Sequence, residues 1–159
     1  MIRVQTQDFN VPEEYHLISQ DNSDGAVVTF VGKVRDFNDG SAVTDLTLEH
    51  YPGMTEKALE NIESQASTKW DLLGTSIIHR VGELKANEQI VFVGVASRHR
   101  KDAFLAAQYI MDFLKNEAPF WKKQRTEKGG NWIESKQSDI DAAKPVSYTH
   151  LTLPTILLV

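Results

Sequence analysis

Positively charged side chains gather in one stretch of a chain that is otherwise acidic. The 159 residues include 17 Lys and Arg against 22 Asp and Glu, which gives a formal net charge of −5. Residues 98–128 reverse this balance, with eight cationic residues against four acidic ones. Positive charge concentrated in an acidic protein indicates a site for an anionic ligand. The cations are Arg98, Arg100, Lys101, Lys115, Lys122, Lys123, Arg125 and Lys128.

His99 and Arg100 stand where a buried strand is expected to end and a helix to begin. The start of a helix carries partial positive charge and free N–H groups, so a cation there is unfavourable unless an anion joins it. A bound phosphate or carboxylate would resolve this conflict. Both side chains could equally project into solvent or meet acidic residues, and the sequence favours neither interpretation.

Lys115 follows Phe104 by about three helical turns and Met111 by about one, so it continues an edge of the apolar face of the expected helix. The simpler interpretation is a lysine at a helix C-terminus whose stem lies along apolar surface, where a cation is favourable anyway. The functional interpretation is a partly desolvated amine that is suited to proton transfer or nucleophilic attack.

Two aromatic residues are followed directly by two cationic residues just after this helix. Phe120 and Trp121 stand beside Lys122 and Lys123. They form either a loop pinned to the core or a flat wall beside an anion site. Lys33 and Arg35 point to one face at the end of another expected strand, where a solvated strand end is the ordinary explanation. His16, His50 and His79 lack metal-ligand spacing, so we expect them to be structural and expect no metal or cofactor.

Hydrophobic periodicity and turn residues predict an α+β fold with a largely antiparallel sheet and packed helices. The expected order is α-β-β-α-β-β-α followed by a short strand, and the first two strands are expected to form a hairpin. Helices are expected at 10–20, 55–70 and 100–115, and strands at 25–35, 44–51, 75–81, 89–97 and 131–134.

The length predicts a single domain, to which we assign residues 1–144. Residues 145–159 lack Asp, Glu, Lys and Arg and follow a very polar segment, so we expect a non-native tail. The first residues lack the apolar core of a signal peptide, and no apolar run is long enough to span a membrane. The absence of Cys agrees with a cytoplasmic location and means that any reacting sulfur comes from a partner. Overall acidity argues against nucleic-acid binding.

Five segments together resemble the large, catalytic subunit of molybdopterin synthase, in one order from about residue 8 to Lys144. They are DGAVVTFVGKVR (24–35), LTLEHYPGMTEKAL (46–59), IIHRVGEL (77–84), EQIVFVGVASRHR (88–100) and AAQYIMDFLKNEAPFWKK (106–123).

The resemblance implies a sulfurtransferase that converts cyclic pyranopterin monophosphate to molybdopterin. The sulfur would come from the C-terminal thiocarboxylate of a small ubiquitin-like subunit. The chain would form the central homodimer of a heterotetramer. Alternatives are a non-catalytic module that binds a phosphorylated heterocycle, or a scaffold that docks a ubiquitin-like partner.

The resemblance also assigns roles to individual residues. Lys115 and Lys122 match the catalytic lysines of the family and would also contact the substrate. The other residues that match its substrate pocket, or adjoin those that do, are Lys33, Val34, Arg35, His99, Arg100, Lys123 and Gln124.

Overall fold

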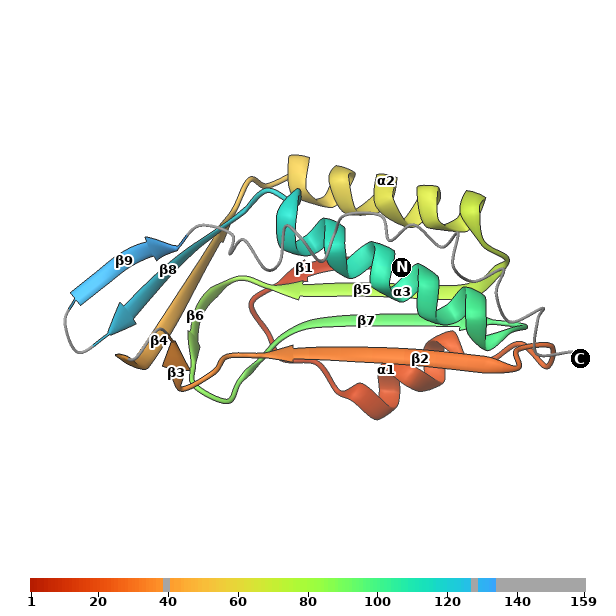
Figure 1. Cartoon of the computed structure of the whole chain (residues 1–159), viewed down its shortest axis with the longest axis horizontal. Coiled ribbons are helices and arrows are strands. Elements are labelled where there is room, and N and C mark those ends of the chain that lie inside the picture. The colour runs from red at the N-terminus through yellow and green to blue at the C-terminus, as the bar shows by residue number, and fades with distance from the viewer. Residues whose placement is uncertain (39–40, 127–128, 134–159) are drawn as a thin grey trace, which may run out of the picture.

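A four-stranded sheet forms the centre of the computed structural model, which describes residues 1–38, 41–126 and 129–133 (Figure 1). Its strands are β1 (Ile2–Gln5), β5 (Leu72–Arg80), β7 (Gln89–Ser97) and β2 (Ala26–Lys33), in that order across the sheet. β1 pairs with β5 in parallel, and the other neighbours are antiparallel. β7 is therefore central, and β2 is an edge strand of this sheet.

A second sheet lies at one end of the first, beside the C-terminal end of helix α3 (Figure 1). Its strands are β3 (Phe37–Asn38), β4 (Ser41–His50), β8 (Phe120–Thr126) and β9 (Gly129–Ile133), and β6 (Gly82–Lys85) pairs with β4. All of these pairings are antiparallel. The chain enters this sheet three times, at β3 and β4, at β6, and at β8 and β9, so the sheet joins segments that are far apart in sequence.

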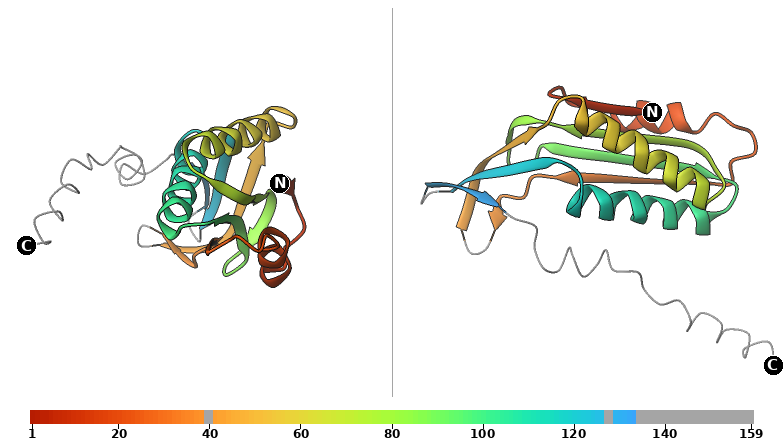
Figure 2. Two further views of the ribbon diagram at one scale, coloured as in Figure 1. Left: turned by 90° about the vertical axis from the view of Figure 1, so that its right-hand side faces the viewer. Right: turned by 90° about the horizontal axis from the view of Figure 1, so that it is seen from above.

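Three helices cover the first sheet, two on one face and one on the other (Figure 2). Helices α2 (Met54–Lys69) and α3 (Arg100–Asn116) lie side by side on one face, and α1 (Val11–Ile18) lies on the other. The side chain of Asn10 accepts a hydrogen bond from the N–H of Glu13 and so caps α1, which begins near the start of the helix expected at 10–20.

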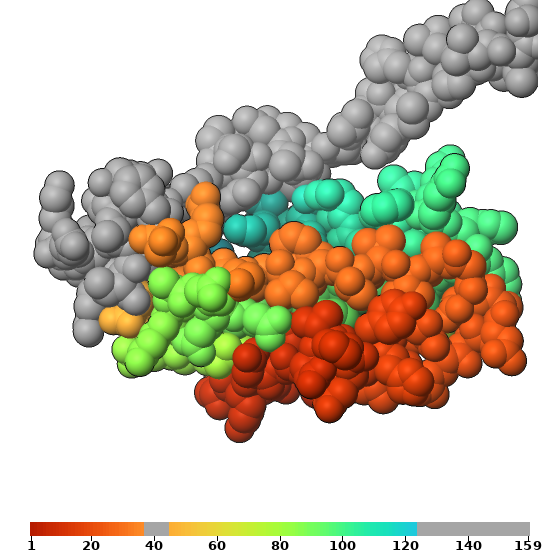
Figure 3. Space-filling model, turned by 90° about the horizontal axis from the view of Figure 1, so that it is seen from below, coloured from red at the N-terminus to blue at the C-terminus, as the bar shows by residue number. Residues whose placement is uncertain are grey.

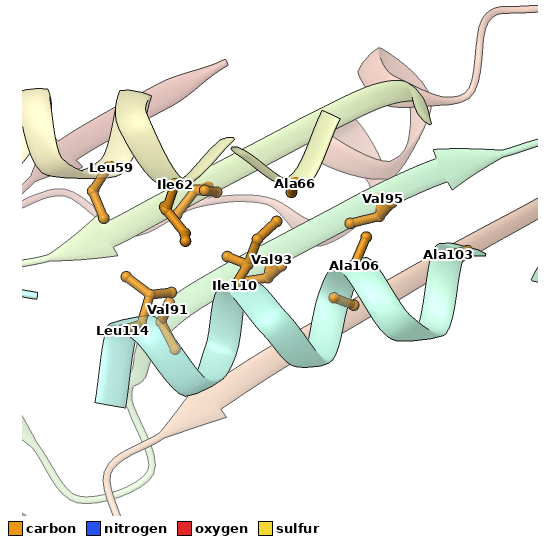
Figure 4. Packing of buried hydrophobic residues seen from close by; sticks show 12 residues of the cluster. Leu59, Ile62, Ala66, Val91, Val93, Val95, Ala103, Ala106, Ile110 and Leu114 are labelled. Atoms are coloured by element: carbon orange, nitrogen blue, oxygen red, sulfur yellow. The ribbon is translucent and has the colours of Figure 1, made fainter. Parts of the chain in front are cut away.

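The main core lies between the first sheet and helices α2 and α3 (Figure 4). Each buried Val, Leu or Ile side chain contributes about 1.5–3 kcal/mol relative to an exposed one, so this layer supplies much of the stability. It includes Leu59, Ile62 and Ala66 of α2, Val91, Val93 and Val95 of β7, and Ala103, Ala106, Ile110 and Leu114 of α3.

Helix α3 does not bury the face that we expected. The apolar periodicity placed Phe104 on the buried face. Ala103 and Ala106 are fully buried instead, while Phe104 is 63% exposed. Small alanines let α3 approach the sheet closely, and the larger side chain is left at the margin of the interface. Phe104 is consequently available to line a surface groove.

On the opposite face, α1 packs directly onto the middle of β7. A Cβ atom at Gly94 would lie 2.5 Å from the terminal methyl of Ile18 and 2.8 Å from the ring of Phe92. Both faces of β7 are thus covered, as its continuous apolar sequence indicated.

The predicted α+β class and the largely antiparallel sheets are confirmed, and the 89–97 strand agrees with β7. The predicted hairpin is wrong, because β2 pairs with β7 whereas β4 pairs with β3, β6 and β8. Strands β1, β3, β6 and β8 were not predicted. The expected tail, 145–159, and the end of the expected domain at Lys144 lie outside the described residues. Within the part that is described, no helix is long and apolar enough to cross a membrane.

Candidate active site

Two lysines from different elements meet around one buried histidine. Lys115 lies in the last turn of α3, and Lys122 lies on β8. The positive charges of both act on the imidazole of His79, at the end of β5. The structure therefore brings together the two lysines that the sequence analysis named as catalytic.

The strand geometry of β8 turns Lys122 inward and Lys123 outward. Lys122 is the register partner of Leu48, which is only 1% exposed. Neighbouring residues of a strand point to opposite faces, and Lys123 is indeed exposed. The two lysines, both predicted to contact the substrate, therefore point to opposite faces of β8 within one chain. Gln124 continues β8 opposite Leu46.

Residues 33–35 lie at the same end of the molecule as the two lysines. The side chain of Val34 is buried with Leu48, the register partner of Lys122. Val34 is thus a core residue, and only its backbone is suited to contact a ligand. Lys33 donates a hydrogen bond from Nζ to Oδ1 of Asn87 at 2.6 Å. Arg35 is exposed.

His99 and Arg100 lie at the opposite end of α3. His99 is the N-cap residue and Arg100 begins the helix, and both are exposed. Fifteen residues separate Arg100 from Lys115, which corresponds to roughly 22 Å along a helix. Within one chain, the predicted phosphate-binding residues are therefore too far from the lysines to hold the same small molecule.

A groove of about 430 Å³ runs between β2 and α3 and reaches Lys115. β2 and α3 lie side by side along this edge of the molecule (Figure 3). On α3 the lining residues Phe104, Gln108, Met111 and Lys115 follow one another at three- or four-residue steps, so they form one stripe. On β2 the groove is lined by Val28, Thr29 and Phe30.

The groove is mainly apolar but contains one carboxylate besides the lysine. Partial burial raises the pKa of Asp112, against the opposing effect of a hydrogen bond that the side-chain amide of Gln108 donates to it at 2.7 Å. Phe30 and Phe104 are 41% and 63% exposed. Exposed aromatic side chains beside a groove are typical of a surface that a peptide or partner covers. Lys115 itself is exposed, which agrees with the simpler of its two interpretations, and the partly desolvated amine of the functional interpretation is not present in this chain alone.

His79 is the feature of the site that the sequence analysis missed, because it was interpreted as structural. Its ring is stacked on that of Phe120, with centroids 3.7 Å apart and planes at 16°. Nδ1 lies 2.8 Å from the carbonyl oxygen of Arg80, so this nitrogen carries the hydrogen and donates it. A histidine directly after two isoleucines in an expected strand was the available signal.

The histidine is held in its neutral form. Burial lowers the pKa of His79 to about 4, and the positive charges of Lys122, His50 and Lys115 act in the same direction. The hydrogen bond with the Arg80 backbone opposes these effects. In the described part of the chain, no group of three or more His, Cys, Asp or Glu side chains is placed to hold a metal ion.

Comparison with known proteins agrees with this arrangement. The family model described as "MoaE protein" matches residues 4–117. The molybdopterin synthase catalytic subunit of Yersinia pestis is 57% identical over 143 residues, which cover 90% of this chain and 95% of that protein. The molybdopterin synthase structure from Staphylococcus aureus is 33% identical with a TM-score of 0.77, covering 82% of this chain and 95% of that one.

A more distant structure shares the fold. It is a chain from the complex of subunits 1 and 2 of the molybdopterin-converting factor of Helicobacter pylori, with 18% identity and a TM-score of 0.69. The match covers 94% of this chain and 97% of that chain.

The neutral histidine generates a prediction about stability and pH. Between about pH 6.5 and pH 4, the unfolded chain binds a proton at His79 that the folded chain does not bind. The free energy of unfolding should therefore decrease as the pH falls through this window, by on the order of 3 kcal/mol for this group. Urea unfolding at pH 7.0, 5.5 and 4.5, at one protein concentration, measures it.

The comparison with two variants isolates this contribution. The free energy of unfolding of His79→Phe should depend less on pH than that of the wild type. His16→Phe, at an exposed position of α1, should keep the wild-type dependence on pH. An unchanged dependence in His79→Phe would show that His79 does not titrate as the structure indicates.

Proposed function

The chain belongs to the MoaE family of molybdopterin synthase catalytic subunits, and we propose that Lys115 and Lys122 carry out sulfur transfer where the groove meets His79. The predictions of an enzyme and of a role in molybdenum cofactor biosynthesis are confirmed by this membership. The observation that carries the residue-level proposal is the meeting of both lysines around one buried histidine, with the groove reaching Lys115.

The proposed substrates are cyclic pyranopterin monophosphate and the C-terminal thiocarboxylate of a small ubiquitin-like subunit. The thiocarboxylate sulfur would form a bond to a carbon of the pterin side chain and break the C–O bond at that carbon, so that the oxygen leaves either as water after protonation or as part of the phosphate group. Water would then cleave the resulting thioester, leaving sulfur on the substrate and a carboxylate on the partner. The chain contains no Cys, which supports a sulfur donor outside it. We place this reaction in the cytoplasm.

The groove between β2 and α3 is the proposed path of the partner's C-terminal tail. Its exposed phenylalanines provide apolar contacts, and its inner end delivers a bound tail to Lys115. β2 is an edge strand, so its backbone is suited to pair with an extended peptide. The Helicobacter pylori structure contains two different subunits, which supports a partner of this kind.

The lysines act by charge and by proton transfer in this proposal. Lys115 would bind or activate the reacting carbonyl where the tail meets the pterin. Lys122 would serve as a general acid or stabilise the negative charge that develops in the transition state. Because His79 is neutral, its imidazole does not add a positive charge beside these two side chains.

The phosphate is proposed to be bound by residues of two copies of the chain. Arg35 lies at the end of the molecule that holds the lysines, whereas His99 and Arg100 lie roughly 22 Å away along α3. In a homodimer, the first turn of α3 of one copy could lie next to the lysines of the other copy. His99 and Arg100 of the first copy would then lie close to Arg35 of the second. Such a dimer would be the central dimer of a heterotetramer and would provide the phosphate with its cations.

Replacing Lys115 tests the catalytic assignment. Lys115→Ala removes the charge and the amine, and Lys115→Arg keeps the charge but does not readily lose a proton. If proton transfer or amine attack is required, both variants should lose about 100-fold or more in turnover while still binding substrate and partner. Formation of the dithiolene product from the pterin and a thiocarboxylated small subunit measures turnover.

The matched control is Lys57→Ala, at an exposed position of α2, which should retain wild-type turnover. Substantial recovery in Lys115→Arg would show that charge alone matters. Near-normal turnover in Lys115→Ala would contradict the assignment and favour a module that only binds the phosphorylated pterin.

Mixed dimers test whether the phosphate site is shared between copies. Arg100→Ala and Lys115→Ala chains, carrying different affinity tags, would be co-expressed and purified through both tags. Each mixed dimer then has one site with both substitutions and one with neither, so turnover should be about half that of the wild type. Each variant alone should remain poorly active, and a mixed dimer no better than either would place both residues in one chain's site.

A charge in the groove tests the path of the tail. Phe104→Glu should raise the Kd for the small subunit about tenfold or more, because it places a carboxylate in an apolar contact. Leu17→Glu is the matched control, since Leu17 is a similarly exposed apolar residue on α1, at 52%. Calorimetric titration gives both constants, and equal Kd values for the two variants would rule out docking in this groove.

A further inference from the structure

The stacked pair His79 and Phe120 joins the two sheets of the molecule. His79 ends β5 of the first sheet, and Phe120 begins β8 of the second. The planes differ by only 16°, so the rings touch over their faces. Phe120 also packs against the main core. The position of the first residue of β8 is therefore determined in part by its contact with the face of the His79 imidazole.

Lys122 follows Phe120 by two residues on the same face of the strand. The register partners of Phe120 and Lys122 are His50 and Leu48, which also share a face. The two residues are about 6.6 Å apart along the strand. A displacement of the Phe120 ring is therefore expected to displace the nearby strand backbone, which carries Lys122.

The imidazole suits this position because it is flat and neutral. The carbonyl of Arg80 fixes the hydrogen on Nδ1, which orients the ring plane. The titratable groups that act on the ring are Lys122 from β8, Lys115 from α3 and His50 from β4, and a positive charge on any of them opposes a positive charge on the ring. A cationic side chain here would repel both lysines, and a flexible one would not offer Phe120 a rigid face.

We propose that His79 is a positioning residue for Lys122, acting through its stacked contact with Phe120. The inference rests on the proposed function of Lys122 and goes beyond it, because it assigns a role to a residue outside the proposed catalytic pair of lysines. Misplacing a catalytic group by about 1 Å lowers turnover by up to about 100-fold, so a small change in the stack is sufficient to affect the rate.

Three substitutions of His79 distinguish the contribution of its flat ring from the contribution of its hydrogen bond. His79→Phe keeps a flat neutral ring and loses the donor. His79→Gln keeps a donor for the Arg80 carbonyl and loses the ring, and His79→Ala loses both. We expect kcat to fall at least about tenfold in the Gln and Ala variants and to stay within about threefold of wild type in the Phe variant. KM for the pterin and Kd for the small subunit should change little in all three.

The environment of the Lys122 side chain can be measured by NMR, without a measurement of turnover. With lysines reductively methylated using a ¹³C label, the NMR signal of Lys122 should shift in the Gln and Ala variants and stay near its wild-type position in the Phe variant. The signal of Lys57, on the exposed side of α2, serves as the internal control. If the wild type lacks turnover, the proposed function fails, while this experiment still tests the positioning.

Phe120→Leu provides an independent variant in case substitution of His79 prevents folding. It removes the other half of the stack while keeping an apolar side chain, so it should lower kcat and shift the Lys122 signal as His79→Gln does. In the double variant the effects should not add, because both remove one interaction. The proposal is overturned if His79→Ala keeps wild-type kcat per folded molecule, if His79→Phe loses as much as His79→Ala, or if the Lys122 signal does not move.

Discussion

The burial of β7 on both faces is the interaction on which the arrangement of the charged residues depends. Val91, Val93 and Val95 pack against α2 and α3, while Phe92 packs on the side of α1. Because β7 runs directly into α3 through residues 98 and 99, the helix must fold back along the strand that precedes it. This antiparallel return places the start and the end of α3 at opposite ends of the sheet. The separation of Arg100 from Lys115 is therefore a consequence of core packing and not a property of the site.

The second sheet has a different role, because it brings Lys122 to the end of α3. β4 and β8 pair over seven register positions, and β4 also holds β6, so β8 is supported along its length. Its attachment to the first sheet includes the contact of Phe120 with His79. A lysine on a supported strand and a lysine in the last turn of a helix are both held by backbone hydrogen bonds. Such rigid elements fix functional groups more accurately than loops do.

Elements with strong local signals could be predicted from the sequence. The helix expected at 100–115 is α3, and the strand expected at 89–97 is β7, since long periodic or apolar runs define them. β8 was missed because its sequence, FWKKQRT, lacks an alternation of apolar and polar residues. β1 is only four residues long and is held by parallel pairing with a distant strand. The wrong hairpin of β2 with β4 has the same cause, because strand pairing depends on contacts that local sequence does not encode.

The features of the site also divide into those that could be predicted from the sequence and those that depend on the complete fold. The resemblance indicated Lys115 and Lys122, and the structure brings them together, but their meeting point is a histidine whose neutral state depends on burial between two sheets. Burial of this kind is a property of the complete fold. The same is true of Val34, whose side chain belongs to the core, and of Phe104, which local periodicity assigned to the wrong side of its helix.

The uncharged state of His79 also has a consequence for how the site responds to acidity. A histidine with an ordinary pKa would gain and lose charge as the pH varies around neutrality. With its pKa lowered to about 4, this one keeps the same charge in the folded protein over that range. The electrostatic field that it contributes beside the lysines is consequently insensitive to pH near neutrality.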